Sequence, residues 1–194
     1  MSQQDVMGRS KFCYYLETSK SRQDTIRSHR SFQEVIMAKK TYNEKLNDSK
    51  NMPVVEKVSD PKTIARFGGE LMLIAPPLVY DEIMKQVPAG KVITSDRIRD
   101  YLAKKHNADY TCQLTAGIFI NIAAHASVER AGLNPTPFYR TLKKDGELNE
   151  KYPDGCGRQK FMLESEGHTV IQKGKRYFVK DYEHALWDIN ELEN

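Results

Sequence analysis

The chain has 194 residues, of which 39% are hydrophobic and 29% are charged, and its formal net charge at pH 7 is +4. This composition is typical of a globular protein with one modest core. No apolar run approaches the roughly 18 residues that a transmembrane helix needs, so we expect no membrane contact. The excess positive charge lies in residues 1–70 and residues 71–194 are formally neutral. Any attraction of the second region to phosphate must therefore come from local clusters.

The cysteine pattern argues against a disulfide framework and against a zinc site. The three cysteines are Cys13, Cys112 and Cys156, an odd number without C-x-x-C spacing. The first 30 residues are polar and contain no hydrophobic signal region. We expect a reducing, cytoplasmic location and neither a metal nor a cofactor.

The N-terminal third of the chain is predicted to lie outside the packed domain. Residues 1–40 are rich in Ser, Arg, Gln and Lys, which predicts a disordered extension. Met37 is a plausible alternative start to Met1. Residues 41–70 contain Pro, Gly, Asn and Asp turn signals, which indicate an extended arm leading to a packed domain over residues 71–194.

The domain is expected to open with an apolar run and two helices. Residues 71–75 are apolar and end at a Pro-Pro pair. The spacing of apolar residues then predicts a helix that ends before Pro88; its buried positions are Val79, Ile83, Met84 and Val87. Thr94 or Ser95 is expected to cap the next helix, which buries Ile98, Tyr101 and Leu102.

A longer helix is predicted from Gln113 to Val128, after a break at 109–112. Leu114, Ile118, Ile122 and Ala126 are expected to lie on one face of this helix. It is rich in Ala and Gly, as a closely packed helix should be. Together with the preceding helix it has the form of a helix-turn-helix.

The C-terminal part completes the expected fold. A helix is predicted over 157–166, followed by a hairpin of residues 169–172 and 176–179 around Lys173, Gly174 and Lys175. A final helix over 182–192 is expected to pack Leu186, Trp187 and Ile189. The predicted fold class is α+β, mainly helical: a winged helix-turn-helix-like DNA-binding domain with a C-terminal β-hairpin and helix.

Six short motifs follow one another in a particular order over residues 78–167. They are P-A-G-K-V-I-T at 88–94, L-T-A-G at 114–117, P-F-Y-R at 137–140, D-G-E-L at 145–148, Y-P-D-G at 152–155 and K-F-M-L-E-S-E-G at 160–167. This series resembles the DNA-binding domain of the O6-alkylguanine-DNA alkyltransferases, also called methylated-DNA–protein-cysteine methyltransferases. In that family a P-C-H-R tetrapeptide carries the cysteine that accepts the alkyl group.

The resemblance implies that the acceptor cysteine is replaced here. Phe138 stands at the cysteine position and Tyr139 at the histidine position. Because a phenyl ring has no lone pair, Phe138 cannot accept an alkyl group. The pattern is similar to the alkyltransferase-like branch of the family, which lacks the acceptor and binds alkylated DNA without repairing it. In this reading Phe138 and Tyr139 form a flat apolar wall for an extruded base; the alternative is that both are ordinary core aromatics.

The resemblance also implies roles for residues outside this tetrapeptide. Leu114 takes the position from which the family inserts an arginine into the duplex. An apolar side chain can also be inserted between bases and unstack them. The alternative is that Leu114 is a core residue. Ser95 is a phosphate contact or a helix cap. Glu166 either accepts a hydrogen bond from the Tyr139 hydroxyl or has a surface or structural use. The implied DNA-binding residues are Thr94, Ser95, Gln113, Leu114, Thr115, Gly117, Phe138, Tyr139, Arg140 and Glu166. Phosphate contacts are also expected from Lys143, Lys144, Lys173, Lys175 and Arg176.

The favoured function is non-catalytic recognition of alkylated or distorted double-stranded DNA in DNA repair, with a repair-pathway protein as a further partner. Two alternatives remain open. One is an altered methyltransferase that uses Cys112, at the start of the recognition helix, or Cys156. The other is a winged-helix module that regulates transcription or binds protein.

Overall fold

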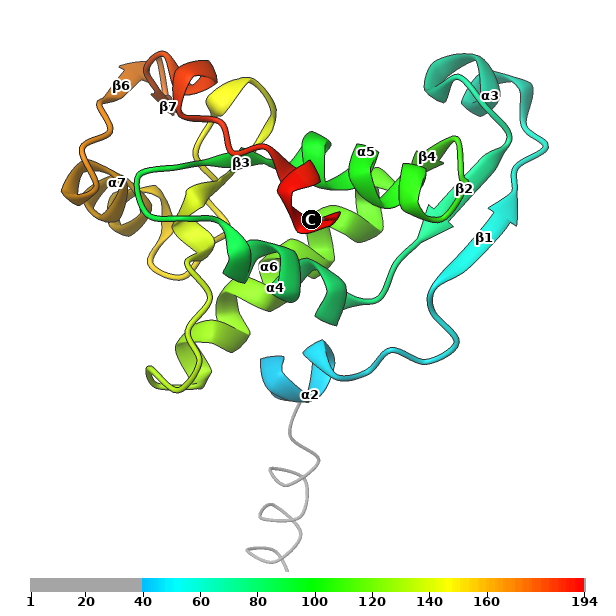
Figure 1. Cartoon of the computed structure of the whole chain (residues 1–194), viewed down its shortest axis with the longest axis horizontal. Helices are drawn as coiled ribbons and strands as arrows, with labels where there is room; N and C mark the ends of the chain where they lie inside the picture. Colours follow the sequence, from blue (N-terminus) through cyan, green and yellow to red (C-terminus); the bar gives the residue numbers. More distant parts are fainter. Residues whose placement is uncertain (1–39, 194) are drawn as a thin grey trace, which may run out of the picture. The chain divides into compact units, whose positions relative to one another are not determined.

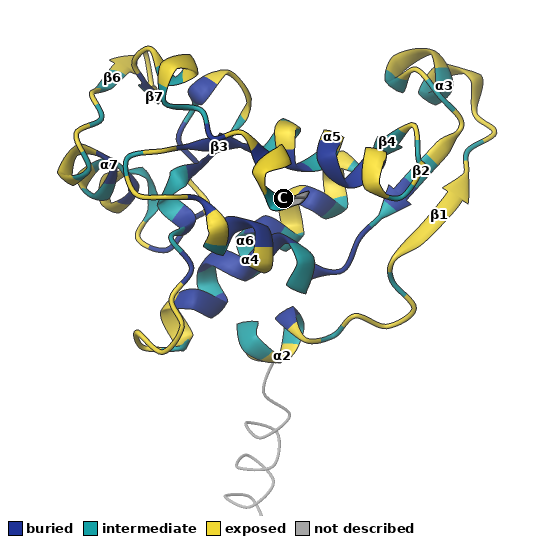
Figure 2. Ribbon diagram, viewed as in Figure 1, coloured by how far each residue is buried: buried dark blue, intermediate teal, exposed yellow. Residues whose placement is uncertain are grey.

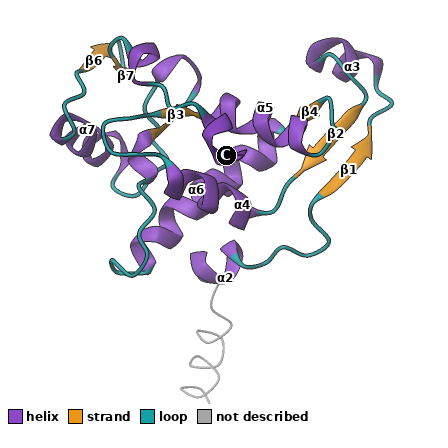
Figure 3. Ribbon diagram, in the orientation of Figure 1, coloured by secondary structure: helices purple, strands orange, loops and turns teal. Residues whose placement is uncertain are grey.

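The computed structural model describes residues 40–193 and shows a mixed α+β fold in which helices dominate (Figure 1, Figure 3). The α-helices are α2 (Tyr42–Leu46), α3 (Pro61–Phe67), α4 (Pro77–Gln86), α5 (Ser95–Lys105), α6 (Gln113–Glu129) and α7 (Gly155–Ser165). The strands are β1 (Val54–Lys57), β2 (Leu71–Ile74), β3 (Ile93–Thr94), β4 (Tyr110–Thr111), β5 (Thr141–Leu142), β6 (Val170–Lys173) and β7 (Arg176–Val179). Four 3₁₀ helices complete it: η1 (Phe138–Arg140), η2 (Lys144–Gly146), η3 (Tyr182–Ala185) and η4 (Ile189–Glu193).

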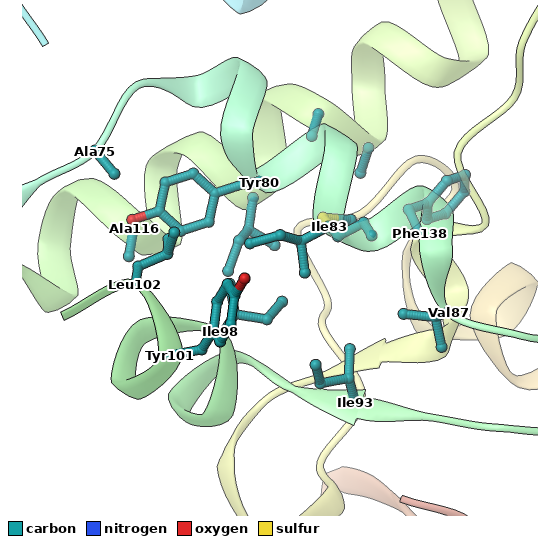
Figure 4. Close-up of a cluster of buried hydrophobic side chains, with 14 of the residues drawn as sticks. Ala75, Tyr80, Ile83, Val87, Ile93, Ile98, Tyr101, Leu102, Ala116 and Phe138 are labelled. Carbon is teal, nitrogen blue, oxygen red and sulfur yellow. The ribbon is translucent and has the colours of Figure 1, made fainter. Parts of the chain in front are cut away.

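The main core lies between α4, α5 and α6 (Figure 4). Tyr80, Ile98 and Leu102 are completely buried there, as the sequence predicted for the last two. Each buried side chain of this size stabilises the fold by about 1.5–3 kcal/mol. A second, smaller cluster joins the strands and α7 and consists of Val92, Leu142, Leu148, Leu163 and Val179. Figure 2 shows the buried residues concentrated in the middle of the ribbon, on α4, α5, α6 and β3, and exposed residues on the loops around them.

The short strands connect distant parts of the chain. β2 pairs with β1 in an antiparallel manner and with β4 in parallel. Because β4 directly precedes α6, this sheet anchors the start of that helix. β3 and β5 pair in parallel, and β6 and β7 form the predicted antiparallel hairpin.

Residues 41–70 form secondary structure, whereas the sequence predicted an extended arm. Thr41 and Glu44 form a reciprocal capping box that starts α2. Asp60 caps α3, which has Pro61 at its first position. These capping signals are present in the sequence and outweigh the nearby turn residues.

α2 is also part of the packed domain, so the domain begins before the predicted position at 71. Leu46 is 2% exposed and belongs to the main core. The backbone amides of Tyr42 and Asn43 each donate a 2.9 Å hydrogen bond to the carboxylate of Glu129 on α6. Residues 41–193 therefore belong to one compact unit. The predicted disordered extension lies, apart from Lys40, outside the described residues.

The C-terminal segment differs from the predicted single helix over 182–192. It forms the two turns η3 and η4 because the chain between them pairs with the segment before β3. The amide of Val92 donates to the carbonyl of Ala185 at 2.9 Å, and the amide of Trp187 donates to the carbonyl of Val92 at 2.8 Å. Trp187 and Ile189 are nonetheless buried, as expected. No helix within residues 40–193 combines the length and apolar character needed to cross a membrane.

Candidate nucleic-acid interface

The N-terminal half of α6 exposes two large apolar side chains. Leu114 is 73% exposed and Ile118 is 48% exposed. Gly117 lies beside them, and an added Cβ there would meet no other atom within 4 Å. This part of the helix is therefore an open apolar surface. Exposed apolar groups of this kind are typical of interaction sites.

Of the two readings of Leu114, the core position is not observed, because Leu114 and Ile118 lie on the open side of the helix. The helix turns Ala116, Ile120, Ala123, Ala124, Ala126 and Ser127 toward the core. Of the four residues predicted on one face, only Ala126 is fully buried, and Ile122 is half-buried. Small residues face the core because α2 and α4 both pack closely against α6.

The start of α6 is electrostatically suited to an anion. Cys112 is the N-cap residue, no side chain caps the first turn, and the first turn contains no acidic residue. Residues 111–128 include no Asp or Glu at all. The unpaired amides and the helix dipole therefore present partial positive charge. Gln113 is exposed at this end, and the half-buried Thr115 donates its hydroxyl hydrogen to the carbonyl of Cys112 at 3.3 Å.

Phe138 occupies the core, which agrees with the second of the two sequence interpretations, an ordinary core aromatic. It is 3% exposed. Its ring packs edge-on against Tyr152 at a centroid distance of 5.4 Å and against Tyr139 at 6.2 Å. The hydroxyl of Tyr152 donates to the carbonyl of Thr141 at 3.0 Å, which fixes that ring. Phe138 thus belongs to the main core, in which Figure 4 shows its side chain.

Tyr139, Arg140 and Glu166 form a hydrogen-bonded cluster. The Tyr139 hydroxyl donates to Oε1 of Glu166 at 2.7 Å, as predicted. Nε of Arg140 lies 3.1 and 3.0 Å from the two carboxylate oxygens, and Nη2 lies 2.5 Å from Oε1. The amide of Gly90 donates to Oε2 at 3.2 Å. Glu166 thereby connects the end of α7 to η1 and to the turn before β3.

The protonation states of this cluster follow from these contacts. Burial opposes ionisation of Glu166, but the hydrogen bonds from Arg140 and Tyr139 outweigh it and lower the pKa of the carboxyl group. Burial, together with the hydrogen bond to Glu166, raises the pKa of the Tyr139 phenol. The cluster is therefore a carboxylate, a guanidinium and a neutral phenol at neutral pH.

Arg140 is committed to protein contacts, whereas the sequence predicted a DNA contact. Its side chain is 14% exposed, and Nη1 donates to the carbonyl of Val87 at 2.7 Å. Lys143 is likewise held by Glu147 and Glu150. Neither side chain is free to bind a phosphate in this arrangement.

The predicted residues at the start of α5 lie at a helix terminus. Thr94 is the N-cap residue and is 3% exposed, and it makes no side-chain capping hydrogen bond. Ser95 is the first helical residue and is half-exposed. Of this pair, only Ser95 presents a surface to a ligand.

Two hydrogen-bonded connections between α6 and the following segment were missed from the sequence. Ser127 Oγ donates to the carbonyl of Thr136 at 3.1 Å and accepts from its amide at 2.8 Å. Asn149 Nδ2 donates to Oδ1 of Asn121 on α6 at 2.9 Å. These pairs hold α6 against the segment that contains η1. No sequence motif predicted them.

A buried ion-pair network supports the same junction. Asp81 on α4 is completely buried and accepts from Thr136 Oγ1 at 2.5 Å. Arg130, at the end of α6, donates to its carboxylate at 3.0 and 3.2 Å, and Lys85 lies 2.8 Å away. Burial opposes ionisation, but these three donors outweigh it and lower the pKa of Asp81.

The β6–β7 hairpin carries a cluster of positive charge. Residues 170–180 contain Lys173, Lys175, Arg176 and Lys180 and no acidic residue. The Lys173 ammonium and the Arg176 guanidinium lie 5.3 and 5.5 Å from the centroid of the Phe178 ring. Arg176 also pairs with Glu147 at 3.0 Å. Lys173 and Lys175 are exposed, so the hairpin tip is a basic surface.

The two described cysteines differ in environment. Cys112 is half-buried at the N-cap of α6. Burial and the charge of Glu150 raise the pKa of Cys156, which lowers its thiolate population and its nucleophilicity. Among residues 40–193 no group of three or more His, Cys, Asp or Glu side chains is arranged to hold a metal ion.

A hollow of about 390 Å³ lies elsewhere, between α4, α5 and Leu192. It includes none of the residues that the resemblance implies for DNA binding. Apolar side chains and the polar Glu82, Gln86 and Lys105 share its lining.

Comparison with known proteins gives two similar solved structures. No protein-family model matches the chain, and no curated protein matches it. In structure it is similar to S. pombe ATL in complex with DNA, with 23% sequence identity and a TM-score of 0.39 over 57% of this chain and 92% of the other. It is also similar to S. pombe Atl1 in complex with damaged DNA containing O6-carboxymethylguanine, with the same identity and TM-score over 57% of this chain and 91% of the other.

Proposed function

We propose that this protein binds double-stranded DNA without catalysis, in the manner of an alkyltransferase-like protein. It recognises alkylated or distorted duplex and presents the damage to another repair component. The observation that carries this proposal is the open face of α6, with exposed Leu114 and Ile118 flanking Gly117 at an uncapped helix N-terminus. A helix end of this kind suits the DNA backbone, and apolar side chains beside it suit unstacked bases.

The absence of alkyl transfer follows from the residues at the acceptor position. Phe138 has no nucleophilic atom and is 3% exposed. The neighbouring Tyr139 phenol is held by Glu166 at 2.7 Å and, with its raised pKa, remains protonated at neutral pH. A neutral phenol is a poor nucleophile. The P-F-Y-R segment therefore stabilises the fold, and α6 binds the DNA.

The remaining elements are interpreted as a winged helix-turn-helix. α5 and α6 are its two helices, and the β6–β7 hairpin is its wing. The exposed Lys173 and Lys175 at the hairpin tip are suited to phosphate contacts. Such contacts supply affinity without sequence preference, and α6 supplies the recognition of damage.

Two duplexes of identical sequence test this proposal, one with O6-methylguanine and one with guanine. Fluorescence anisotropy should give tighter binding of the modified duplex, and intact-mass spectrometry after incubation should give an unchanged protein mass. A mass increase of one methyl group would instead identify a transferase, and Cys112 would be the first residue to examine. Absence of DNA binding at low salt would leave the protein-binding module as the remaining interpretation.

A further inference from the structure

We infer that the hollow between α4, α5 and Leu192 is a docking site for an amphipathic α-helix of a partner protein. That helix carries an apolar anchor residue with a basic residue on one side of it and an acidic residue on the other. The inference goes beyond the proposed function, because the hollow shares no residue with the open face of α6 and requires no DNA. A protein bound in the hollow leaves Leu114 and Ile118 uncovered.

The hollow is lined by one stripe of side chains from each of two helices. The stripes comprise Val79, Glu82, Ile83 and Gln86 on α4, and Tyr101 and Lys105 on α5. Positions i, i+3, i+4 and i+7 lie on one side of a helix, and positions i and i+4 do as well. Its volume of about 390 Å³ lies within the range of about 300–1,000 Å³ that is usual for binding clefts. Two helices that border one groove in this way form the surface that receives a third helix in helix-in-groove complexes.

The hollow has an apolar floor and a polar rim. Ile83 is 5% exposed and Tyr101 is 6% exposed, so both lie deep in it. Glu82, Gln86 and Lys105 are exposed at its edge. An apolar centre within a polar rim is the usual anatomy of a protein–protein interface. The floor is therefore suited to an apolar side chain, and the rim is suited to charged and hydrogen-bonding neighbours of that side chain.

The two walls carry opposite charges that the described part of the chain does not neutralise. Glu82 on α4 forms no ion pair with any residue of 40–193. The Lys105 ammonium on α5 lies over the ring of Tyr101, 5.6 Å from its centroid, and within the same residues it has no acidic partner. A partner helix that places a basic residue at Glu82 and an acidic residue at Lys105 is complementary to both walls, whereas the reverse placement is repelled.

The same features disfavour other occupants of the hollow. The carboxylate of Glu82 repels a phosphate backbone, so nucleic acid is a poor fit. A twofold pairing of two copies through this surface would set one concave face against another, and neither would fill the other. A helix with a projecting apolar side chain fills the floor and satisfies both charges.

A phage-displayed library of helical peptides, randomised at positions i, i+3, i+4 and i+7, tests the inference with the full-length protein. The selected peptides should share an apolar residue with a basic residue on one side and an acidic residue on the other. One such peptide is then synthesised, and its binding is measured by fluorescence anisotropy. Glu82→Lys and Lys105→Glu should each weaken its binding by about tenfold, because each turns an attraction into a repulsion.

Two further variants make the test specific. The double variant Glu82→Lys with Lys105→Glu should regain affinity for a peptide in which the two charges are exchanged. Lys104→Glu is the matched control, because Lys104 is exposed beside Lys105 on α5 and does not line the hollow. It should leave the affinity unchanged.

The contrary results are equally defined. Absence of selected peptides with this pattern, equal effects of Lys104→Glu and Lys105→Glu, or no recovery with the charge-exchanged peptide would each overturn the inference. Self-association in sedimentation velocity that Glu82→Lys abolishes would assign the hollow to a second copy and would also overturn it. None of these measurements involves DNA, so the inference can fail while the proposed function stands.

Discussion

The hydroxyl of Tyr139 donates a 2.7 Å hydrogen bond to Oε1 of Glu166, so the residue after the acceptor position is fixed to the end of α7. Arg140 binds the same carboxylate. Glu166→Gln removes the charge that these donors share, and we expect the free energy of unfolding at pH 7 to fall by about 1.5–3 kcal/mol. The exposed Glu164 on α7 provides a control, since Glu164→Gln should change stability by less than about 0.5 kcal/mol. Urea denaturation measures both, and equal effects would contradict the account.

The stabilisation from Glu166 should depend on pH in a defined direction. Its pKa is lowered in the folded protein from the ordinary value of 4.5. The contribution is therefore complete above about pH 4.5 and is lost as the pH falls through the lower, folded pKa. The stability difference between wild type and Glu166→Gln should be largest near neutral pH and should shrink on acidification. A difference that grows toward low pH would be inconsistent with a carboxylate acceptor.

Asp81 should be among the most sensitive positions for stability. It is completely buried with Arg130, Lys85 and Thr136 around it. Asp81→Ala leaves two partly buried cations without their acceptor, so we expect a loss of about 3–5 kcal/mol. The neighbouring Glu82 is exposed, and Glu82→Ala should change the free energy of unfolding by less than about 0.5 kcal/mol. Thermal denaturation followed by circular dichroism compares the two, and a tolerant Asp81 would show that the network does not stabilise the α4–α6 junction.

The sequence predicted the bounds of α6 to within one residue but did not show which face of the helix is buried. The helix is apolar around most of its circumference, so periodicity alone did not distinguish the core side from the open side. The deciding factor is that α2 and α4 pack closely against alanines and Ser127. α2 itself was missed because the turn residues that follow it suggested an extended arm.

Contacts between residues far apart in the sequence were the second feature that was difficult to predict. The hydrogen bond from Tyr139 to Glu166 was predicted through the resemblance to a known family and is confirmed. The burial of Phe138 was left open, because the resemblance favoured an open wall and the composition favoured a core position. Tyr152, which contacts that ring, comes from a loop whose position follows from tertiary packing. The final helix was predicted wrongly because the pairing of Trp187 with Val92 is a long-range contact.

Gly117 provides a test in which stability and binding should change in opposite directions. An added methyl group meets no protein atom there, and alanine is favoured over glycine within a helix by up to about 1 kcal/mol. Gly117→Ala should raise Tm by about 2–4 °C and weaken DNA binding severalfold, because the methyl group lies beside Leu114 and Ile118. Gly157→Ala in α7 is the matched control, since its added Cβ also meets open space. Unchanged affinity in Gly117→Ala would exclude close approach of DNA to this face.

The basic tip of the β6–β7 hairpin should contribute binding that is sensitive to salt and insensitive to damage. The double substitution Lys173→Glu and Lys175→Glu should weaken modified and unmodified duplexes by the same factor. It should also reduce the slope of log affinity against log salt by about 2, the value for two lost phosphate contacts. Lys50→Glu with Lys62→Glu makes the same charge change in the turn after α2 and in α3, which Figure 1 shows away from the hairpin, and should have the smaller effect. Equal effects of the two double variants would indicate a general charge effect and no specific wing contact.

Amide hydrogen exchange with and without DNA tests the central claim, that the N-terminal half of α6 is the surface that binds the duplex. The first turn of α6 has no side-chain cap, so its amides should exchange rapidly in the free protein. The account predicts that saturating duplex DNA slows exchange most strongly over residues 113–118 and leaves α4, residues 77–86, unchanged. Protection confined to other segments, with residues 113–118 unaffected in a demonstrably bound complex, would contradict it.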